Sequence, residues 1–308
     1  MNYYEVLSQH SEDIELSPSS TSYFSKPGAG LDPRLFRNGK LIAPVREGVL
    51  TLLYNHLKLG YNEPESWTKV WLAGSGVSYN WAAEREPADL DCLVGVNYVQ
   101  FRQSNQEYAG WSDKEISAEI NQGFRSELHP RTENFMEVFE LTFYVNVNSE
   151  ITELNPYAAY SVLDDNWVVP PSLDEAPVRA EWQSSVELDR SKATEIIKRY
   201  AKALEQIKSA SNPAMRINAE TTLATAVQQG SALFDDIHGG RGQAFSQSGQ
   251  GYYDYANYRW QAGKQSGVVS AMKQLKAILK EADERFSRQT YGVELPDVST
   301  LIRRSTRR

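Results

Sequence analysis

Two aspartates one residue apart are the feature of this sequence best suited to chemistry. Asp89 and Asp91 stand at the start of the stretch DLDCLVGV, residues 89–96, whose composition predicts a β-strand. Residues two apart on a strand project from the same face, so both carboxylates point together while Leu90 and Cys92 point into the core. Neighbouring carboxylates repel each other unless a cation lies between them. Mg²⁺ binds one or two carboxylates together with phosphate and water, so the pair is suited to a metal-bound nucleoside triphosphate.

A glycine-serine turn precedes the two aspartates and could hold the phosphates. Gly74-Ser75-Gly76 follows the apolar stretch VWLA, and thirteen residues separate Ser75 from Asp89. We expect a short helix over residues 77–83, whose free N–H groups and positive dipole end would face phosphate. The glycines permit close approach of the backbone, and the hydroxyls of Ser75 and Ser78 can add donors.

This pattern resembles the signature of the DNA polymerase beta-like nucleotidyltransferase superfamily, which is apolar-Gly-Ser, a spacer, then Asp-apolar-Asp-apolar. The resemblance covers residues 70–145, with the spacer at the long end of the range. The rest of the chain more faintly resembles uncharacterised nucleotidyltransferase-like proteins of bacteriophages. The resemblance implies two Mg²⁺ ions, attack on the α-phosphate of a nucleoside triphosphate (NTP), and release of pyrophosphate. It also implies a third carboxylate on a neighbouring strand, which acts as a metal ligand and activates the acceptor hydroxyl.

The third carboxylate is expected on the strand predicted for residues 136–147, MEVFELTFYVNV. Glu140 shares the less apolar face of this strand with Thr142 and lies between apolar neighbours, as the superfamily motif requires. Glu137 shares the other face with bulky hydrophobic residues, so we keep it as the alternative. The superfamily commonly has Asp at this position, and Glu is longer by one methylene.

The sequence does not match other common cofactor-binding, catalytic or metal-binding motifs. A dinucleotide-binding G-x-G-x-x-G would need glycine at position 79, which is Tyr79, and a P-loop fails because Lys264 is followed by Gln265. Cys92 is expected to be a buried small hydrophobic residue rather than a catalytic thiol. No metal-ligand spacing relates the four histidines, and His129-Pro130 is expected to be structural.

A second candidate region is residues 239–264, which is rich in glycine and aromatic residues. Its cations Arg241, Arg259 and Lys264 are the proposed phosphate contacts, with Arg125 and Arg131 as alternatives. The aromatic residues could stack on a base, or they could pack on the helical part of the chain. These aromatic residues are Tyr252, Tyr253, Tyr255, Tyr258 and Trp260.

The strands and helices expected around these residues predict an α+β fold. In this fold a small mixed β-sheet nucleotidyltransferase core with flanking helices is followed by a mainly helical domain. Helical periodicity covers residues 44–58 and 112–128, the latter with a Ser112/Glu115 capping box, and a strand pair is expected within 157–169. Further helices are expected from about residue 188, from 213 to 237 and from 266 to 286, with a loop over 239–251. The predicted domains are an extended arm at 1–40, a catalytic domain at 41–178, a helical domain at 179–298 and a basic tail at 299–308.

The uneven distribution of charge along the sequence bears on the identity of the acceptor. Residues 1–186 hold 13 Lys and Arg against 27 Asp and Glu, whereas residues 187–308 hold 19 against 13. The basic second part favours an RNA 3′ end as the acceptor, with a protein or small-molecule hydroxyl as the other options. The alternatives to an enzyme are a non-catalytic nucleotide- or nucleic-acid-binding protein on the same fold, or an interaction protein without a ligand. The lack of a long apolar run argues against a membrane partner, and a single cysteine fits a cytoplasmic protein.

Overall fold

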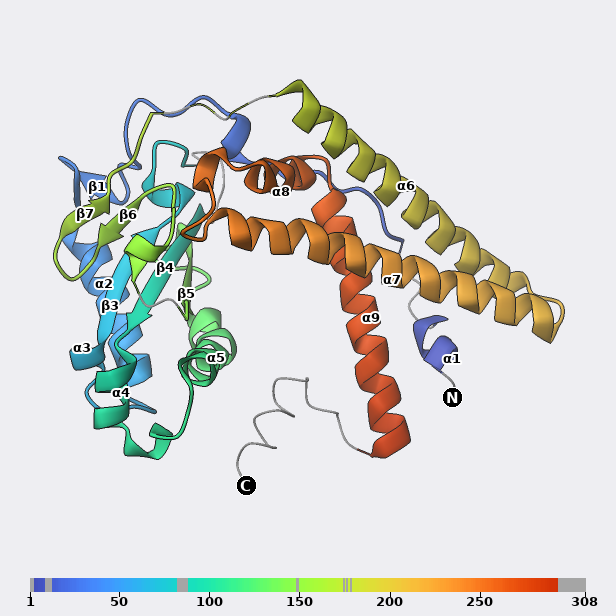
Figure 1. Cartoon of the computed structure of the whole chain (residues 1–308), viewed down its shortest axis with the longest axis horizontal. Helices are drawn as coiled ribbons and strands as arrows, with labels where there is room; N and C mark the ends of the chain where they lie inside the picture. Colours follow the sequence, from blue (N-terminus) through green and yellow to red (C-terminus); the bar gives the residue numbers. More distant parts are fainter. Residues whose placement is uncertain are drawn as a thin grey trace. The chain divides into compact units, whose positions relative to one another are not determined.

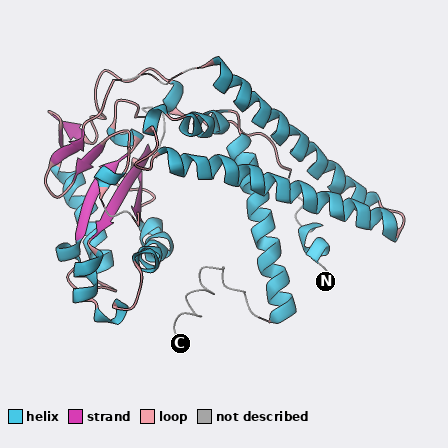
Figure 2. Ribbon diagram, viewed as in Figure 1, coloured by secondary structure: helices cyan, strands magenta, loops and turns pink. Residues whose placement is uncertain are grey.

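The computed structural model describes residues 3–8, 13–81, 88–147, 150–173, 175, 177 and 179–292. The chain divides into two compact units, and neither is a continuous stretch. The sheet unit combines Ser22–Ala176 with Ala244–Asp254, and the helical unit combines Met1–Thr21, Pro177–Gln243 and Tyr255–Arg308. Figure 2 shows the strands gathered in one part of the chain and the long helices in the other. The mixed α+β class and the helical C-terminal part predicted from the sequence are confirmed.

The sheet unit is built on a five-stranded mixed sheet in the order β5-β4-β3-β6-β7 (Figure 1). Only β4 and β5 run parallel, and each of the other neighbouring pairs is antiparallel. A separate hairpin of β1 and β2 lies at the end of the predicted arm and extends one residue beyond it. The bounds of the strands are β1 Phe36–Arg37, β2 Lys40–Leu41, β3 Thr68–Ala73, β4 Ala88–Val96, β5 Phe139–Val145, β6 Ala159–Ser161 and β7 Asn166–Val169.

Short helices complete the sheet unit. The predicted capping box is confirmed, since the side chains of Ser112 and Glu115 each accept the other's backbone N–H at the start of α5. After Gly123 the helix continues as a π-helical turn over Phe124–Leu128. The bounds of the helices in this unit are α2 Ala43–Leu57, α3 Pro64–Trp67, α4 Tyr98–Ser104 and α5 Asp113–Gly123.

The two faces of the sheet have different roles. Side chains alternate along β4, so Leu90, Cys92 and Val94 enter the main core with apolar residues of α2 and α5. The opposite face carries a smaller cluster around Trp71 and Leu93. Burial of the first face supplies most of the hydrophobic stabilisation of this unit, which leaves the end of the second face available for polar side chains.

The helical unit contains α1 Tyr3–Ser8, α6 Ala180–Ser209, α8 Tyr255–Gln265, α9 Val268–Tyr291 and most of α7 Pro213–Ala244. The expected loop over 239–251 is wrong in its first part, because α7 continues to Ala244, and α8 was not predicted. The predicted arm was also not expected to hold a helix, yet α1 packs on α9. The predicted tail, residues 299–308, lies outside the described residues. Within the described residues, no helix is both long and apolar enough to cross a membrane.

Glycines of α7 provide a test of the packing between α7 and α9. A Cβ added at Gly230 would lie 2.3 Å from Cδ1 and 2.8 Å from Cβ of Leu275, whereas one added at Gly239 would meet nothing within 4 Å. We expect Gly230→Ala to lower the free energy of unfolding by about 1–3 kcal/mol through overpacking. Gly239→Ala should raise it by about 0.5–1 kcal/mol, because alanine favours a helix. Urea denaturation of both variants checks this, and equal effects would contradict the packing.

A buried histidine should make the sheet unit sensitive to acid. Burial lowers the pKa of His56, whose Nδ1 is buried without a hydrogen-bond partner. The folded state therefore disfavours the protonated form of His56. The contribution of His56 to stability is fully present above its unfolded pKa of about 6.5, and it is lost as the pH falls through the lower pKa of the folded state. We expect the free energy of unfolding to fall as the pH drops below about 6.5, and to fall less steeply in His56→Leu. Denaturation at a series of pH values measures both slopes, and identical slopes would contradict this assignment.

Candidate active site

The predicted carboxylates lie together at one end of the sheet. Asp89 on β4 is paired in parallel register with Glu140 on β5, so their side chains share a face on strands about 4.8 Å apart. Asp91 lies two residues further along the same face, opposite Ala73 of β3. Asp89 is exposed, and Asp91 and Glu140 are partly buried. The face expected from the sequence is therefore the face that the structure has.

The Gly74–Gly76 turn packs directly against this acidic end of β4. A Cβ added at Gly74 would lie 3.2 Å from Oδ2 of Asp91, and one added at Gly76 would lie 2.6 Å from the carbonyl oxygen of Asp89. Gly74 has φ 91° and ψ −163°, a conformation that essentially only glycine adopts. The turn and the two aspartates are thus in contact, which the sequence could only suggest.

The short helix expected over residues 77–83 is wrong. The chain instead makes one 3₁₀ turn over Ser75–Val77, and residues 82–87 lie outside the described residues. Ser78 is buried, and its hydroxyl donates to the carbonyl oxygen of Ser75 at 2.9 Å. A single turn aligns too few peptide dipoles to act as a helix end, so any phosphate bound here would rely on individual backbone amides of the turn.

Asp89 and Asp91 suit Mg²⁺ as two ligands at an open site, rather than as part of a complete set of protein ligands. In the described part of the chain, no three His, Cys, Asp or Glu side chains come together as a metal site. Mg²⁺ that carries a nucleotide needs only one or two carboxylates, because phosphate and water supply its other ligands. Asp89 and Asp91 meet that requirement by donor type and by their shared face.

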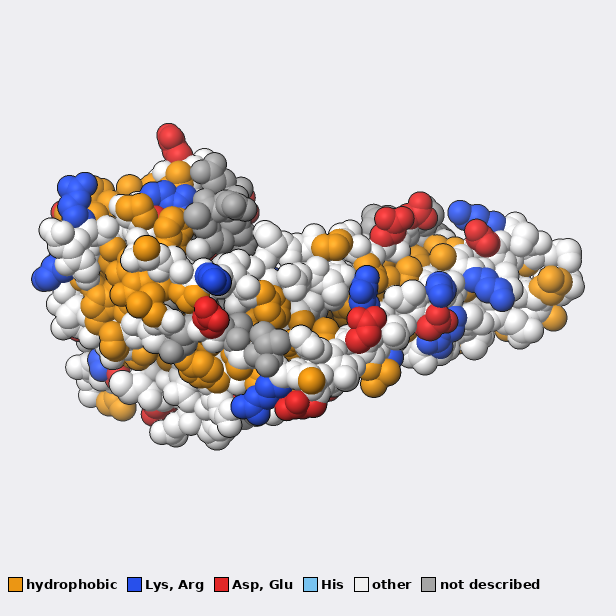
Figure 3. All heavy atoms as spheres, turned by 90° about the horizontal axis from the view of Figure 1, so that it is seen from above, with side chains coloured by type: hydrophobic (Ala, Val, Ile, Leu, Met, Phe, Trp, Pro, Cys, Tyr) orange, Lys and Arg blue, Asp and Glu red, His pale blue; other side chains and the backbone are white. Residues whose placement is uncertain are grey.

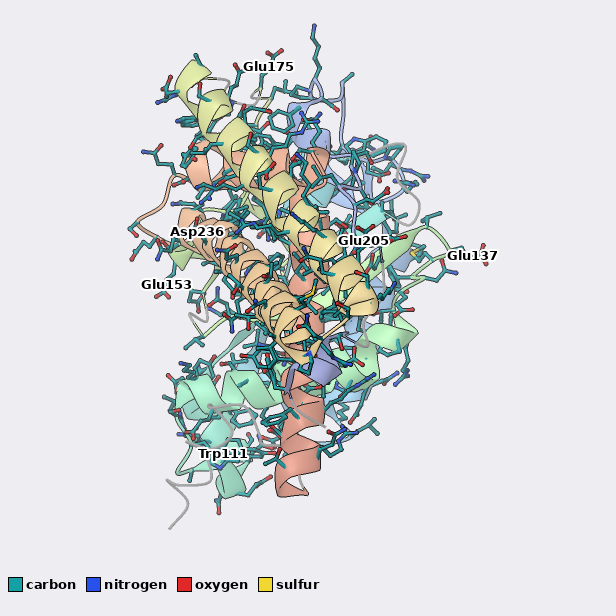
Figure 4. All side chains as sticks on the ribbon, turned by 90° about the vertical axis from the view of Figure 1, so that its right-hand side faces the viewer. Trp111, Glu137, Glu153, Glu175, Glu205 and Asp236 are labelled. Atoms are coloured by element: carbon teal, nitrogen blue, oxygen red, sulfur yellow. The ribbon has the colours of Figure 1, made fainter. Side chains whose placement is uncertain are left out.

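Glu140 is better placed than Glu137 to be the third carboxylate. Strand β5 begins at Phe139, because Met136 and Glu137 adopt positive φ values of 53° and 65° in the preceding turn. Figure 4 shows the side chain of Glu137 projecting outward at the margin of the molecule. Glu137 therefore does not share a strand face with Asp89, whereas Glu140 is its register partner.

His129, which was expected from the sequence to be structural, lies next to the site. Its Nε2 lies 3.7 Å from Oε1 of Glu140 and 4.0 Å from Oε1 of Glu133, and its Nδ1 is buried without a hydrogen-bond partner. His129 and Glu140 belong to different elements, so their proximity is visible only in the folded structure. Arg131 lies two residues further and is exposed, and Arg125 donates to Gln122 on the surface, so neither is buried in a structural role.

Cys92 follows Asp91 but faces the main core. Burial raises the pKa of its thiol, and the nearby charge of Asp91 raises it further. The thiol is therefore neutral at physiological pH and behaves as a small apolar side chain.

The three cations of the second candidate region all belong to the helical unit. Arg259 donates to both carboxylate oxygens of Asp189, at 2.6 and 3.0 Å, and contacts Asp236 at 2.7 Å. Its charge is already balanced, which makes it less suited to phosphate than the sequence indicated. Contact of Arg241 and Lys264 with phosphate stays a prediction.

The same region also supplies a segment to the sheet unit. Residues 244–254 pack along residues 154–157, where the N–H of Asn155 donates to the carbonyl of Phe245 at 3.1 Å. The ring of Tyr157 contacts Phe245 and Tyr252, with centroids 5.6 and 4.8 Å apart. No sequence signal tied residues 154–157 to this segment, because the two stretches are about ninety positions apart.

No family model, curated protein or solved structure matches the chain.

The close approach at Gly76 can be tested by one methyl group. Because its Cβ would collide with the main chain of Asp89, Gly76→Ala must displace the turn or β4. We expect a loss of about 1–3 kcal/mol in the free energy of unfolding, together with weaker binding of Mg²⁺–ATP. Gly110→Ala is the control, since a Cβ there meets nothing within 4 Å. Urea denaturation and calorimetry measure the two effects, and a Gly76→Ala variant indistinguishable from the control would contradict the contact.

Proposed function

We propose that this chain is a Mg²⁺-dependent nucleotidyltransferase that moves a nucleoside monophosphate from an NTP to a hydroxyl acceptor. The observation that carries the proposal is the meeting of Asp89 and Asp91 with the Gly74–Gly76 turn, with Glu140 in register beside Asp89. Two carboxylates on a rigid strand, next to a backbone turn without side chains, suit a metal-bound triphosphate.

The residues would have distinct roles in an in-line displacement. Asp89 and Asp91 would hold Mg²⁺, which when bound neutralises phosphate charge and favours ionisation of the acceptor hydroxyl. The turn would orient the triphosphate through its backbone. Glu140 would face the acceptor and take its proton as the acceptor oxygen bonds to the α-phosphorus. The bond from that phosphorus to the bridging oxygen breaks, and pyrophosphate leaves.

The acceptor class rests on surface charge, and this signal is weaker in the structure than in the sequence. On the face drawn in Figure 3, Lys and Arg side chains lie beside Asp and Glu side chains along the helical unit. The helical unit contains ion pairs such as Lys198–Glu195 and Arg216–Glu220. An RNA 3′ end is the first acceptor to test, followed by protein and small-molecule hydroxyls.

The proposal is tested by following the α-phosphate. The chain is incubated with Mg²⁺ and each α-labelled NTP, with bulk RNA, protein or small-molecule extracts as the acceptor. We expect label transfer with stoichiometric pyrophosphate release, reduced about a hundredfold or more in Asp89→Asn and in Asp91→Asn. Glu140→Gln should slow transfer while NTP binding persists, because it removes the proton acceptor rather than the nucleotide site.

The control is Glu107→Gln, which removes an exposed carboxylate elsewhere in the sheet unit. Equal transfer by the aspartate variants and this control would overturn the proposal. Binding of Mg²⁺–NTP without transfer to any acceptor would instead favour the non-catalytic nucleotide-binding protein. Calorimetry that shows no Mg²⁺–NTP binding would exclude both.

A further inference from the structure

A cavity of about 360 Å³ opens in the sheet unit beside the candidate active site. Its walls come from residues within 78–80, 154–157, 169–172 and 250–253, four stretches that the fold brings together. The volume lies within the range of about 300–1,000 Å³ that small-molecule sites occupy.

The cavity and the Gly74–Gly76 turn belong to one hydrogen-bonded structure. The backbone N–H of Ser78 donates to the carbonyl of Ser75 at 3.0 Å, and Ser78 lines the cavity. The N–H of Gly74 donates to the carbonyl of Ala158 at 3.1 Å, next to the cavity residue Tyr157. A 3₁₀ turn rises about 2 Å per residue, so the wall at Ser78 begins about 6 Å from Ser75. That separation suits a nucleoside attached to a phosphate at the turn.

The position of the cavity along the sheet favours binding of the donor nucleoside there, rather than binding of the acceptor. In the order β5-β4-β3-β6-β7, Glu140 lies on β5, at one side of the turn that follows β3. The cavity lies on the other side, where Val169 ends β7 and Tyr157 precedes β6. The acceptor needs to be near Glu140 to lose its proton, so the β6–β7 side is left for the donor nucleotide.

The lining has the chemistry of a base and ribose site. None of its residues is an acid, a lysine, an arginine or a histidine, so it offers nothing to balance a phosphate. It offers the rings of Tyr157, Tyr252 and Tyr253 with the amide side chains of Asn80 and Asn155. Aromatic rings stack on bases of any type. Because Nδ2 of each asparagine already donates within the protein, the amide oxygens are the groups that can accept hydrogen bonds from a base.

One wall of the cavity is held rigid, and one ring at its mouth is accessible. Tyr252 is buried, its hydroxyl accepts from Nδ2 of Asn80 at 3.2 Å, and its ring lies 4.9 Å from that of Tyr23. Tyr253, the next residue, is 41% exposed. A fixed wall reduces the ordering cost of binding, and an accessible ring provides a surface for stacking.

We propose that this cavity holds the nucleoside of the donor NTP, with the base stacked on the ring of Tyr253. This inference rests on the proposed nucleotidyl transfer, because the Gly74–Gly76 turn is taken as the phosphate end of the same ligand. Recognition through rings and amides, without charge, places base selection in the sheet unit rather than among the cations of the helical unit.

The experiment compares a nucleotide with its phosphates alone. Calorimetry with Mg²⁺ uses α,β-methylene analogues of the four NTPs, which cannot release pyrophosphate, and inorganic tripolyphosphate. We expect the wild-type chain to bind at least one analogue about tenfold or more tighter than tripolyphosphate. Tyr253→Ala should remove most of that difference without changing tripolyphosphate affinity, and Tyr253→Trp should keep it. Tyr4→Ala, at a tyrosine of similar exposure (38%) in the helical unit, is the matched control.

A second variant guards against an indirect effect of losing the ring. Ser172 is an exposed residue of the lining, so Ser172→Trp should fill part of the cavity while the melting temperature stays unchanged. We expect it to weaken analogue binding about tenfold and to leave tripolyphosphate binding intact.

The outcomes separate this inference from the proposed function. Equal affinity for analogue and tripolyphosphate, or unchanged analogue binding in both Tyr253→Ala and Ser172→Trp, would overturn the cavity assignment. Label transfer that depends on Asp89 would still support the enzyme in that case. If neither analogue nor tripolyphosphate binds, the inference and the proposed function fail together.

Discussion

The contact between the turn after β3 and the main chain of β4 is the constraint on which the candidate site depends. A Cβ at position 76 would lie 2.6 Å from the carbonyl oxygen of Asp89, a distance that real Cβ atoms do not show. The antiparallel pairing of Ala73 with Asp91 fixes the same approach from the other side of the turn. Main-chain sterics and register therefore set the distance between the backbone of the Gly74–Gly76 turn and the carboxylates. Side-chain flexibility contributes little to it, so a metal-bound triphosphate would meet a preorganised site.

The strand that carries the carboxylates can bear their repulsion because its other face is deeply buried. Leu90 and Cys92 alternate with Asp89 and Asp91 and have 1% and 0% exposure. Burial of apolar side chains on one face fixes the register of the strand, since a slip of one residue would exchange the two faces. The acids are consequently held side by side by the register of the strand, which is the arrangement that a bound cation would use.

Local signals in the sequence predicted local features of the structure. Alternation predicted the inward and outward faces of β4, and Ser112 with Glu115 predicted the start of α5. Glu140 was chosen by its face and by its position between apolar neighbours, and the parallel register of β4 with β5 confirms that it shares a face with Asp89. These features depend on neighbours within a few residues or on the period of two along a strand, which a single sequence contains.

The errors arose where distant parts of the chain decide the outcome. The segment that begins with glycines at 239, 240 and 242 was expected to be a loop, but α7 continues through them to Ala244, so their weak helix propensity does not end the helix. The segment 244–254 was assigned to a helical domain, although its hydrogen bonds to Asn155 place it in the sheet unit. Such pairings across about ninety residues leave no local pattern.

Balanced charge in the helical unit changes which groups can stabilise a bound triphosphate. Arg259 is shared by Asp189 and Asp236, and its pKa is raised chiefly by the hydrogen bonds to Asp189. Taking that arginine for a phosphate would strand a buried carboxylate, Asp189 being 5% exposed, and leaving such a charge unpaired costs several kcal/mol. In the proposed function, the phosphate charge would therefore be better compensated by Mg²⁺ on Asp89 and Asp91 and by the amides of the turn. On this argument ion pairs such as Arg259 with Asp189 and Asp236 occupy part of the positive charge in the second half of the sequence. The proposed chemistry would then depend on the acidic half.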